Sequence, residues 1–323
     1  MSARATRSRG LSLLELTIAT SIMVGALLMV NEFVGTAQRA QVYIGARDKA
    51  SQHGSQLISD LRGAGLSSRR LFQDDAEGRS YLAALDTASF PILAGARLPV
   101  VDASGRLEPD AAGARRTGNA LLLACEDRPQ QFTTSGARHR VDVVRFIGVF
   151  PTRRTGKIVE AMPDRIDLVR FASRQYADKA SLDQIAVAAE KAEVVLALRA
   201  QGMTRAWVAG AAIGSAFFAL NADGTVASAP VVSPVIDCPP DAPARTMLGS
   251  SKTSVAPNSP ALRIPQFAEP DTAATAFPSG FEVKVVGPSG GRQVLVRLVL
   301  LVGVTGGADA DASLVRLFSV RDL

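Results

Sequence analysis

Residues 11–38 contain no lysine or arginine, and their only charged side chains are Glu15 and Glu32. The first 21 of these residues, 11–31, are almost entirely apolar or small. As a helix they would span about 30 Å, the thickness of the hydrocarbon core of a bilayer. Three arginines, Arg4, Arg7 and Arg9, precede them without any acidic residue, and such a basic flank stays on the cytoplasmic side. The sequence therefore predicts a single membrane-spanning helix at its N-terminus.

Glu15 is unusual in this segment. A carboxylate within an apolar membrane segment costs about 2.5–3.5 kcal/mol on insertion scales, so it needs a partner, most simply a cation at similar depth. Cleavage of the chain after Gly10 would create such a cation, because Leu11 would then carry a free amine. Glu15 follows four residues later, one helical turn away, and could meet its own amine or that of a neighbouring subunit.

Arg9-Gly10 followed by Leu11-Ser-Leu-Leu-Glu15-Leu resembles the leader junction of type IV prepilins and type II secretion pseudopilins. This resemblance implies that a prepilin peptidase cuts between Gly10 and Leu11 and methylates the amine of Leu11, and that Glu15 acts in assembly. Leu11 departs from the phenylalanine usual in the family. A secretory signal cleaved near residues 35–37, or a plain single-pass anchor, would leave Glu15 unexplained.

Beyond residue 31 apolar and small residues recur at intervals of three and four up to Ala64, which predicts one continuous amphipathic helix from Leu11 to about Gly63. Its end, with Leu57, Asp60, Leu61, Arg62, Ala64 and Gly65, resembles the Leu-x-x-Asp-Leu-Arg-x-Ala-Gly pattern of PilW-type minor pilins. The type II secretion pseudopilin GspJ has a related segment. Asp60 and Arg62 are equally compatible with a solvated helix end.

Residues 66–323 read as a β-rich head. Strands are predicted at 120–124, 141–150, 166–171, 193–198, 206–208, 216–220, 281–286, 294–304 and 314–320, with loops at 287–291 and 305–312. The run 295–304 is nearly all apolar and is expected to be a central strand covered on both faces. Ten of the 17 prolines lie in 228–279, which predicts an extended surface insertion. The expected fold is α+β and pilin-like: a leader (1–10), a long helix (11–65, membrane-spanning over 11–31), and an antiparallel sheet packed on that helix.

The two cysteines leave two alternatives open. A periplasmic head would permit a disulfide between Cys125 and Cys238, which could stabilise by up to about 4.7 kcal/mol through loop closure. Alternatively they are separate thiols, with Cys125 buried at the end of an apolar strand.

The sequence offers no motif for catalysis, and we expect neither an enzyme nor a metal or cofactor. Asp309 and Asp311 are more typical of a polar loop than of a calcium site. Arginine clusters at 69–70, 115–116, 138–140 and 153–154 could contact phosphate, but aromatic residues for base stacking are few, so nucleic acid is an improbable partner. Without the three leader arginines the net charge falls from +6 to +3.

The resemblance implies a minor pilin that primes pilus assembly and is displayed near the tip. Its partners would be other minor and major pilins, the prepilin peptidase, an inner-membrane assembly platform and the lipid bilayer. It would sit in the inner membrane with a periplasmic head before assembly, and at the cell surface afterwards. A type II secretion minor pseudopilin, and a tip adhesin or DNA-binding module using 228–279 or the arginines, remain the alternatives.

Overall fold

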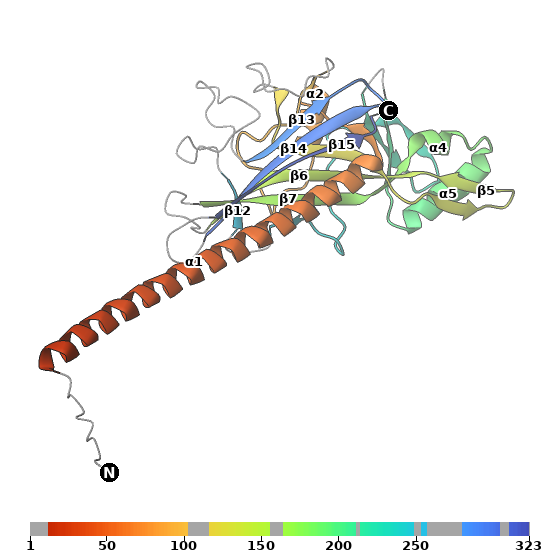
Figure 1. Cartoon of the computed structure of the whole chain (residues 1–323). Coiled ribbons are helices and arrows are strands. Elements are labelled where there is room, and N and C mark those ends of the chain that lie inside the picture. The colour runs from red at the N-terminus through yellow and green to blue at the C-terminus, as the bar shows by residue number, and fades with distance from the viewer. Residues whose placement is uncertain are drawn as a thin grey trace, which may run out of the picture.

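The computed structural model of the chain describes residues 12–102, 116–155, 164–210, 214–248, 253–256, 280–303 and 310–322. Figure 1 shows one long helix, α1, whose C-terminal part lies against a head made mainly of strands and whose N-terminal part projects away from it. The described helices and strands are α1 (Leu13–Leu66), β1 (Ser68–Leu71), α2 (Ala76–Ala83), β2 (Val101–Asp102), β3 (Leu121–Glu126), β4 (Gln130–Thr133), β5 (Arg138–Val141), β6 (Val143–Thr155), β7 (Asp164–Asp178), α4 (Lys179–Asp183), α5 (Ala188–Ala200), β8 (Arg205–Val208), β9 (Ala216–Leu220), β10 (Val226–Pro230), β11 (Arg245–Thr246), β12 (Thr253–Val255), β13 (Phe281–Val286), β14 (Arg292–Val302) and β15 (Ala310–Val320). The α+β class predicted from the sequence is confirmed.

Helix α1 is continuous over 54 residues, about 80 Å at 1.5 Å per residue. It contains no proline, and its N-terminus is closed by the side chain of Ser12, which accepts a hydrogen bond from the backbone of Glu15. It ends at Leu66, where the hydroxyl of Ser67 donates to the carbonyl of Ala64 at 3.1 Å. The predicted continuous helix is confirmed, with its end three residues beyond Gly63.

Strand β14 is the centre of a mainly antiparallel sheet, which we call the helix sheet. It pairs with β15 along one side and with β13 and β12 along the other, and only the short β2 joins in parallel. Residues 296–302 of β14 are all buried, which confirms the prediction of a covered central strand. One face of the helix sheet packs against α1 (Figure 1), and the hairpin loop predicted at 287–291 joins β13 to β14.

A second sheet, the hairpin sheet, has the strand order β1-β3-β6-β7-β8-β9-β10, with β11 paired to β7. Its strands alternate between two cores. Leu121, Leu123 and Cys125 face the core shared with α1 and the helix sheet, whereas Leu122 and Ala124 face a core rich in aromatic rings. In that second core the indole of Trp207 donates to the hydroxyl of Tyr81 at 3.0 Å. A third core lies under α4 and α5 in a lateral lobe with the β4–β5 hairpin.

Three sequence predictions are wrong in whole or in part. Residues 193–198, predicted as a strand, lie inside α5, because the alanines around them favour a helix and because Val194, Val195 and Leu198 have the three-and-four spacing that buries one helical face. The proline-rich stretch is also not merely a surface excursion. Its β11 and β12 extend the two sheets, and Ile236, Leu248 and Val255 are almost completely buried. Residues 249–252 and 257–279 of this stretch, like 305–309 of the loop expected at 305–312, lie outside the described residues. Residues 310–312 of that loop are instead the beginning of β15.

Candidate functional site

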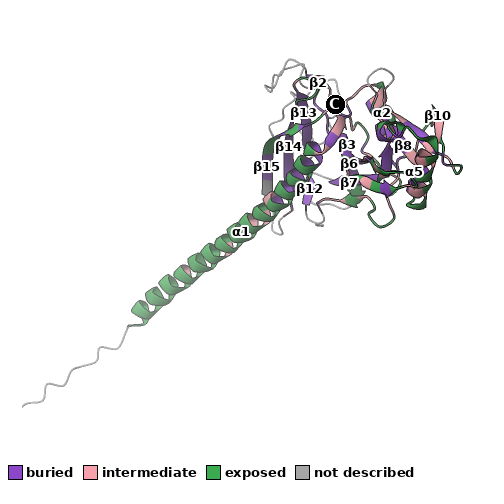
Figure 2. Cartoon of the chain, turned by 90° about the vertical axis from the view of Figure 1, so that its right-hand side faces the viewer, coloured by how far each residue is buried: buried purple, intermediate pink, exposed green. Residues whose placement is uncertain are grey.

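The N-terminal half of α1 exposes a continuous apolar surface. The exposed fractions are 85% for Leu13, 75% for Met29 and 75% for Phe33, and every residue from Ser12 to Lys49 is exposed or only partly buried. Figure 2 shows this as an exposed rod that becomes buried only where it reaches the sheets. The helix is long enough and apolar enough to cross a membrane. In water such a surface is unfavourable, so it requires an apolar environment.

At the start of this rod, Ser12 and Glu15 form a reciprocal cap. The backbone N–H of Ser12 donates to Oε2 of Glu15 at 2.9 Å, and the backbone N–H of Glu15 donates to the hydroxyl of Ser12 at 3.2 Å. The carboxylate therefore points back along the chain toward the expected cleavage junction. Gly10 and Leu11, the two residues of that junction, lie outside the described residues.

The C-terminal part of α1 is fixed to the head by small and apolar residues. Gly54 lies so close to the helix sheet that an added Cβ would come within 2.6 Å of Leu314 Cδ1. Leu57, Leu61, Ala64 and Gly65 of the PilW-like pattern are buried in the same contact, while Asp60 and Arg62 are exposed. The pattern thus combines packing residues with two charged side chains at the surface.

Directly after α1, Arg69 ties the helix end to the hairpin sheet and the lateral lobe. Its guanidinium contacts the carboxylates of Glu126 at 2.6 Å, Asp142 at 2.9 Å and Asp178 at 3.1 Å. Burial alone would lower the pKa of Arg69, but its hydrogen bonds and charge interactions with these three acids raise it, so the side chain stays a cation. The direction of α1 relative to the head is consequently held by charge as well as by packing.

The two cysteines are not joined. Cys125 is buried on the α1 side of the hairpin sheet, where its thiol donates to the carbonyl of Ala64 at 3.3 Å, and burial raises its pKa to about 12. Cys238 packs against the aromatic core, on the opposite face of that sheet. A disulfide would have to cross the sheet, so the structure corrects that expectation and agrees with a buried Cys125 thiol at the end of an apolar strand.

Most of the arginine clusters considered for phosphate binding are used within the head. Arg70 is paired with Glu77, Arg116 with Asp102, Arg140 with Asp142 and Arg154 with Asp167, while His139 contacts Glu190 at 2.8 Å. Arg115 lies outside the described residues. Paired guanidinium groups have less charge to offer a phosphate backbone, because the carboxylates partly neutralise them.

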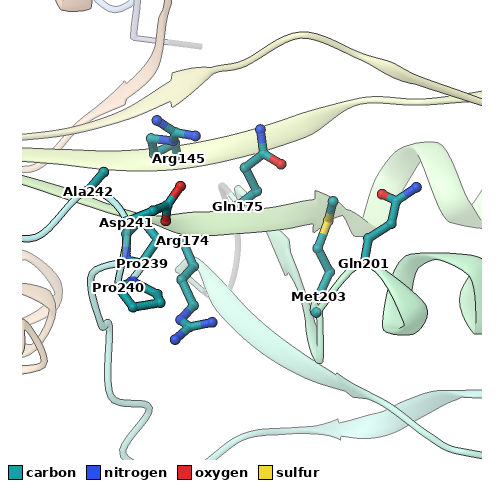
Figure 3. A pocket seen from close by; sticks show the side chains of 10 residues that line it. Arg145, Arg174, Gln175, Gln201, Met203, Pro239, Pro240, Asp241 and Ala242 are labelled. Atoms are coloured by element: carbon teal, nitrogen blue, oxygen red, sulfur yellow. The ribbon is translucent and has the colours of Figure 1, made fainter.

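A polar pocket of about 360 Å³ lies between the ends of β6 and β7, the turn after α5 and the Pro239–Ala242 turn (Figure 3). Two arginines line it, but both are already neutralised: Arg145 contacts Asp127 at 3.1 Å and Arg174 contacts Asp237 at 2.5 Å. The pocket belongs partly to the proline-rich stretch considered for ligand recognition. Its internal ion pairs give it no net attraction for an anion.

Within the described ranges, no three His, Cys, Asp or Glu side chains come together in a way that could hold a metal ion. Asp309 of the proposed polar loop is not among the described residues.

Sequence reasoning did not find the contacts of Arg69, nor the juxtaposition of Arg170 and Arg245, which are directly opposite each other on β7 and β11. Both depend on strand pairing across long sequence separations, for which the sequence carries no local signal. Comparison of the chain with protein-family models, curated proteins and solved structures finds no match.

Proposed function

We propose that this protein is a PilW-like minor pilin, a subunit that is anchored by α1 and then assembled through it into a type IV pilus. One observation carries the proposal: the same helix exposes an apolar rod of membrane length at one end and is packed into a folded head at the other. A plain membrane anchor would need the rod, but it would need neither Glu15 near its start nor a rigid continuation into the head.

In this proposal the prepilin peptidase removes residues 1–10 and methylates the amine of Leu11. Glu15 is the assembly residue. Its carboxylate closes the first turn through Ser12, and a carboxylate has lone pairs for further donors, so it could also accept an amine from Leu11 of the same or of a neighbouring chain. Enclosed among apolar helices, that pair would be strong, because the effective dielectric constant is low there.

The apolar rod would occupy two environments in succession, first the membrane and then the filament. In the inner membrane, residues 13–31 would lie in the lipid bilayer while the head lies in the periplasm. In the filament, the same surface would pack against the helices of other minor and major pilins, after the assembly platform has extracted the subunit. Both environments are apolar, so the exposed leucines of residues 13–31 are never left in water.

The N-terminus of the purified protein tests the processing step. We expect the mature chain to begin at methylated Leu11, as measured by mass spectrometry of its first peptide. A chain that begins near Gln38, or one that keeps residues 1–10, would contradict the proposal. Glu15→Ala should be processed normally yet fail to assemble.

The type II secretion minor pseudopilin is the nearest alternative, because the rod, the head and Glu15 would serve it equally. Co-purification separates the two: type IV pilins among the partners support the proposal, and secretion pseudopilins support the alternative. A tip adhesin or DNA-binding role is less favoured, since the arginines that would carry it are mostly ion-paired.

A further inference from the structure

A groove lies between the C-terminal part of α1 and β11. It consists of two adjoining hollows of about 230 and 430 Å³ that share Asp60 of α1 and Arg245 of β11. Arg170 of β7 also lines the larger hollow, and Thr246 lines the smaller. We call it the α1–β11 groove.

The two arginines of this groove lie side by side, and neither forms an ion pair with a carboxylate among the described residues. Arg245 and Arg170 are directly opposite in antiparallel strands, which places their Cβ atoms about 5 Å apart and makes the pairing of like charges unfavourable. Among the described residues, neither guanidinium makes an ion pair or a side-chain hydrogen bond. Other arginines of the same head, such as Arg69, do have carboxylate partners.

Asp60 is on the opposite wall, on the exposed side of α1, and it too makes no ion pair with a described residue. The groove therefore presents two positive charges on the sheet side and one negative charge on the helix side. A guanidinium binds a carboxylate through two parallel N–H···O bonds, so an acidic side chain suits the Arg170–Arg245 wall. A basic side chain of the same segment suits Asp60.

The position of the groove decides what kind of partner can supply these groups. It begins at His53, 22 residues beyond the end of the apolar run at Asn31, about 33 Å along the helix axis at 1.5 Å per residue. Lipid headgroups bounding residues 13–31 would be well short of it. A nucleic acid needs several uncompensated cations along its backbone, and here there are two beside an acid.

From these observations we propose that the α1–β11 groove docks a mixed-charge segment of an unlike neighbouring pilin subunit, whose carboxylate binds Arg170 and Arg245 and whose basic residue binds Asp60. The identity of the neighbour rests on the proposed function, because a minor pilin in a priming complex has unlike pilins on either side. The charge pattern itself does not depend on that function. Docking of such a segment would also give Asp60 of the PilW-like pattern a binding role, in addition to being a solvated residue at the helix end.

Photo-crosslinking of the full chain in its own cells tests this. A photoreactive residue at Thr246, which is half-buried in the groove, should form a covalent adduct with an acidic segment of another pilin-like subunit, identified by mass spectrometry. Arg170→Glu together with Arg245→Glu should reduce that adduct about tenfold or more, because charge reversal replaces two attractions by repulsions. The milder Arg170→Gln with Arg245→Gln should give an intermediate loss.

The matched control is Arg128→Glu with Arg138→Glu, two exposed arginines outside the groove, which should leave the adduct unchanged. Lysine substituted at the identified acid should restore crosslinking to the Glu double variant. An adduct with lipid, with a second copy of this chain or with an uncharged segment would overturn the proposal, as would an adduct insensitive to charge reversal. If the chain proves not to be a pilin but the adduct behaves as described, the groove stands and only the neighbour changes.

Discussion

The two halves of α1 are one helix with opposite surroundings. Between residues 13 and 49, every side chain is exposed or only partly buried. Further along the helix, Ala50, Gly54, Leu57, Leu61 and Ala64 are buried against the sheets. Residues 13–31 are apolar around most of the helix circumference, whereas the part of α1 that packs on the head is apolar on one face. Apolar content alone therefore does not identify a core, and the angular distribution of apolar residues separates a helix meant for lipid or other helices from one meant for its own head.

The largest effect is expected at Glu15, in the exposed half. If α1 assembles into a filament as proposed, Glu15→Ala should lower assembly by at least about a hundredfold, because breaking an enclosed ion pair costs about 3–5 kcal/mol. The unfolding of the head should not change, since the side chain of Glu15 bonds only to Ser12 among the described residues. Assembled subunits are counted in sheared filaments, and Glu32→Ala is the matched control. Normal filament incorporation of Glu15→Ala would contradict the role assigned to this carboxylate.

Leucine truncation compares the two halves directly. Leu57→Ala should destabilise the head by about 2–5 kcal/mol, because Leu57 is 2% exposed in the core between α1 and the sheets. Leu27→Ala, at a side chain that is 58% exposed, should leave head stability unchanged. Urea unfolding of the full chain in detergent measures both through the fluorescence of Trp207, the only tryptophan. Equal effects of the two variants would mean that the exposed half also packs on the head.

The glycines of α1 give a smaller contrast of the same kind. Gly54→Ala should cost about 1 kcal/mol, because its Cβ would lie 2.6 Å from Leu314 Cδ1 and that side chain would have to shift within a packed core. Gly45→Ala has no atom within 4 Å of the added Cβ, so it should stabilise the helix by up to about 1 kcal/mol. The same unfolding measurement distinguishes them. A stabilising Gly54→Ala would show that the helix–sheet contact is loose.

Low pH should reduce the folding stability of the head and leave the exposed half of α1 unaffected. Burial would raise the pKa of Asp127, but hydrogen bonds from the Gln175 side chain and the Arg128 backbone, with the charges of Arg145 and Arg128, lower it overall. A lowered pKa in the folded state means that this carboxylate stabilises the fold above its unfolded pKa, near 4, and loses that contribution as the pH falls through the folded value. Asp127→Asn should reduce stability at neutral pH by at most about 1 kcal/mol.

The Asp127→Asn variant should also show a shallower loss of stability below pH 4 than the original chain, in the same fluorescence assay. An identical acid dependence in both proteins would remove Asp127 from the groups responsible. Residues 13–38 of α1 are charged only at Glu15 and Glu32, so their contribution to the helical circular dichroism signal should change little over this range.

The sequence was most informative where structure is local. The continuous α1 follows from the absence of proline and from its apolar spacing, and the strands 216–220 and 281–286 were predicted to the residue. The strand predicted at residues 193–198 was wrong, because a short apolar run does not by itself distinguish a strand from a buried helix face. The α1–β11 groove was beyond prediction, since Arg170 and Arg245 meet only through the pairing of strands 75 residues apart.

The last strand of the chain closes the fold around the first helix. Arg321 N–H lies 3.4 Å from the carbonyl of Gly65, and the carboxylate of Asp322 accepts from the backbone of Leu71 at 3.2 Å and from Arg292 at 3.1 Å. At 5–20 residues per second, roughly 13–50 s of synthesis separate the two partners. During synthesis, the part of the apolar face of α1 that β15 covers therefore stays uncovered until the C-terminus is made. A chain truncated before β15 would lack the strand that covers much of the packed half of α1, including the contact of Gly54 with Leu314.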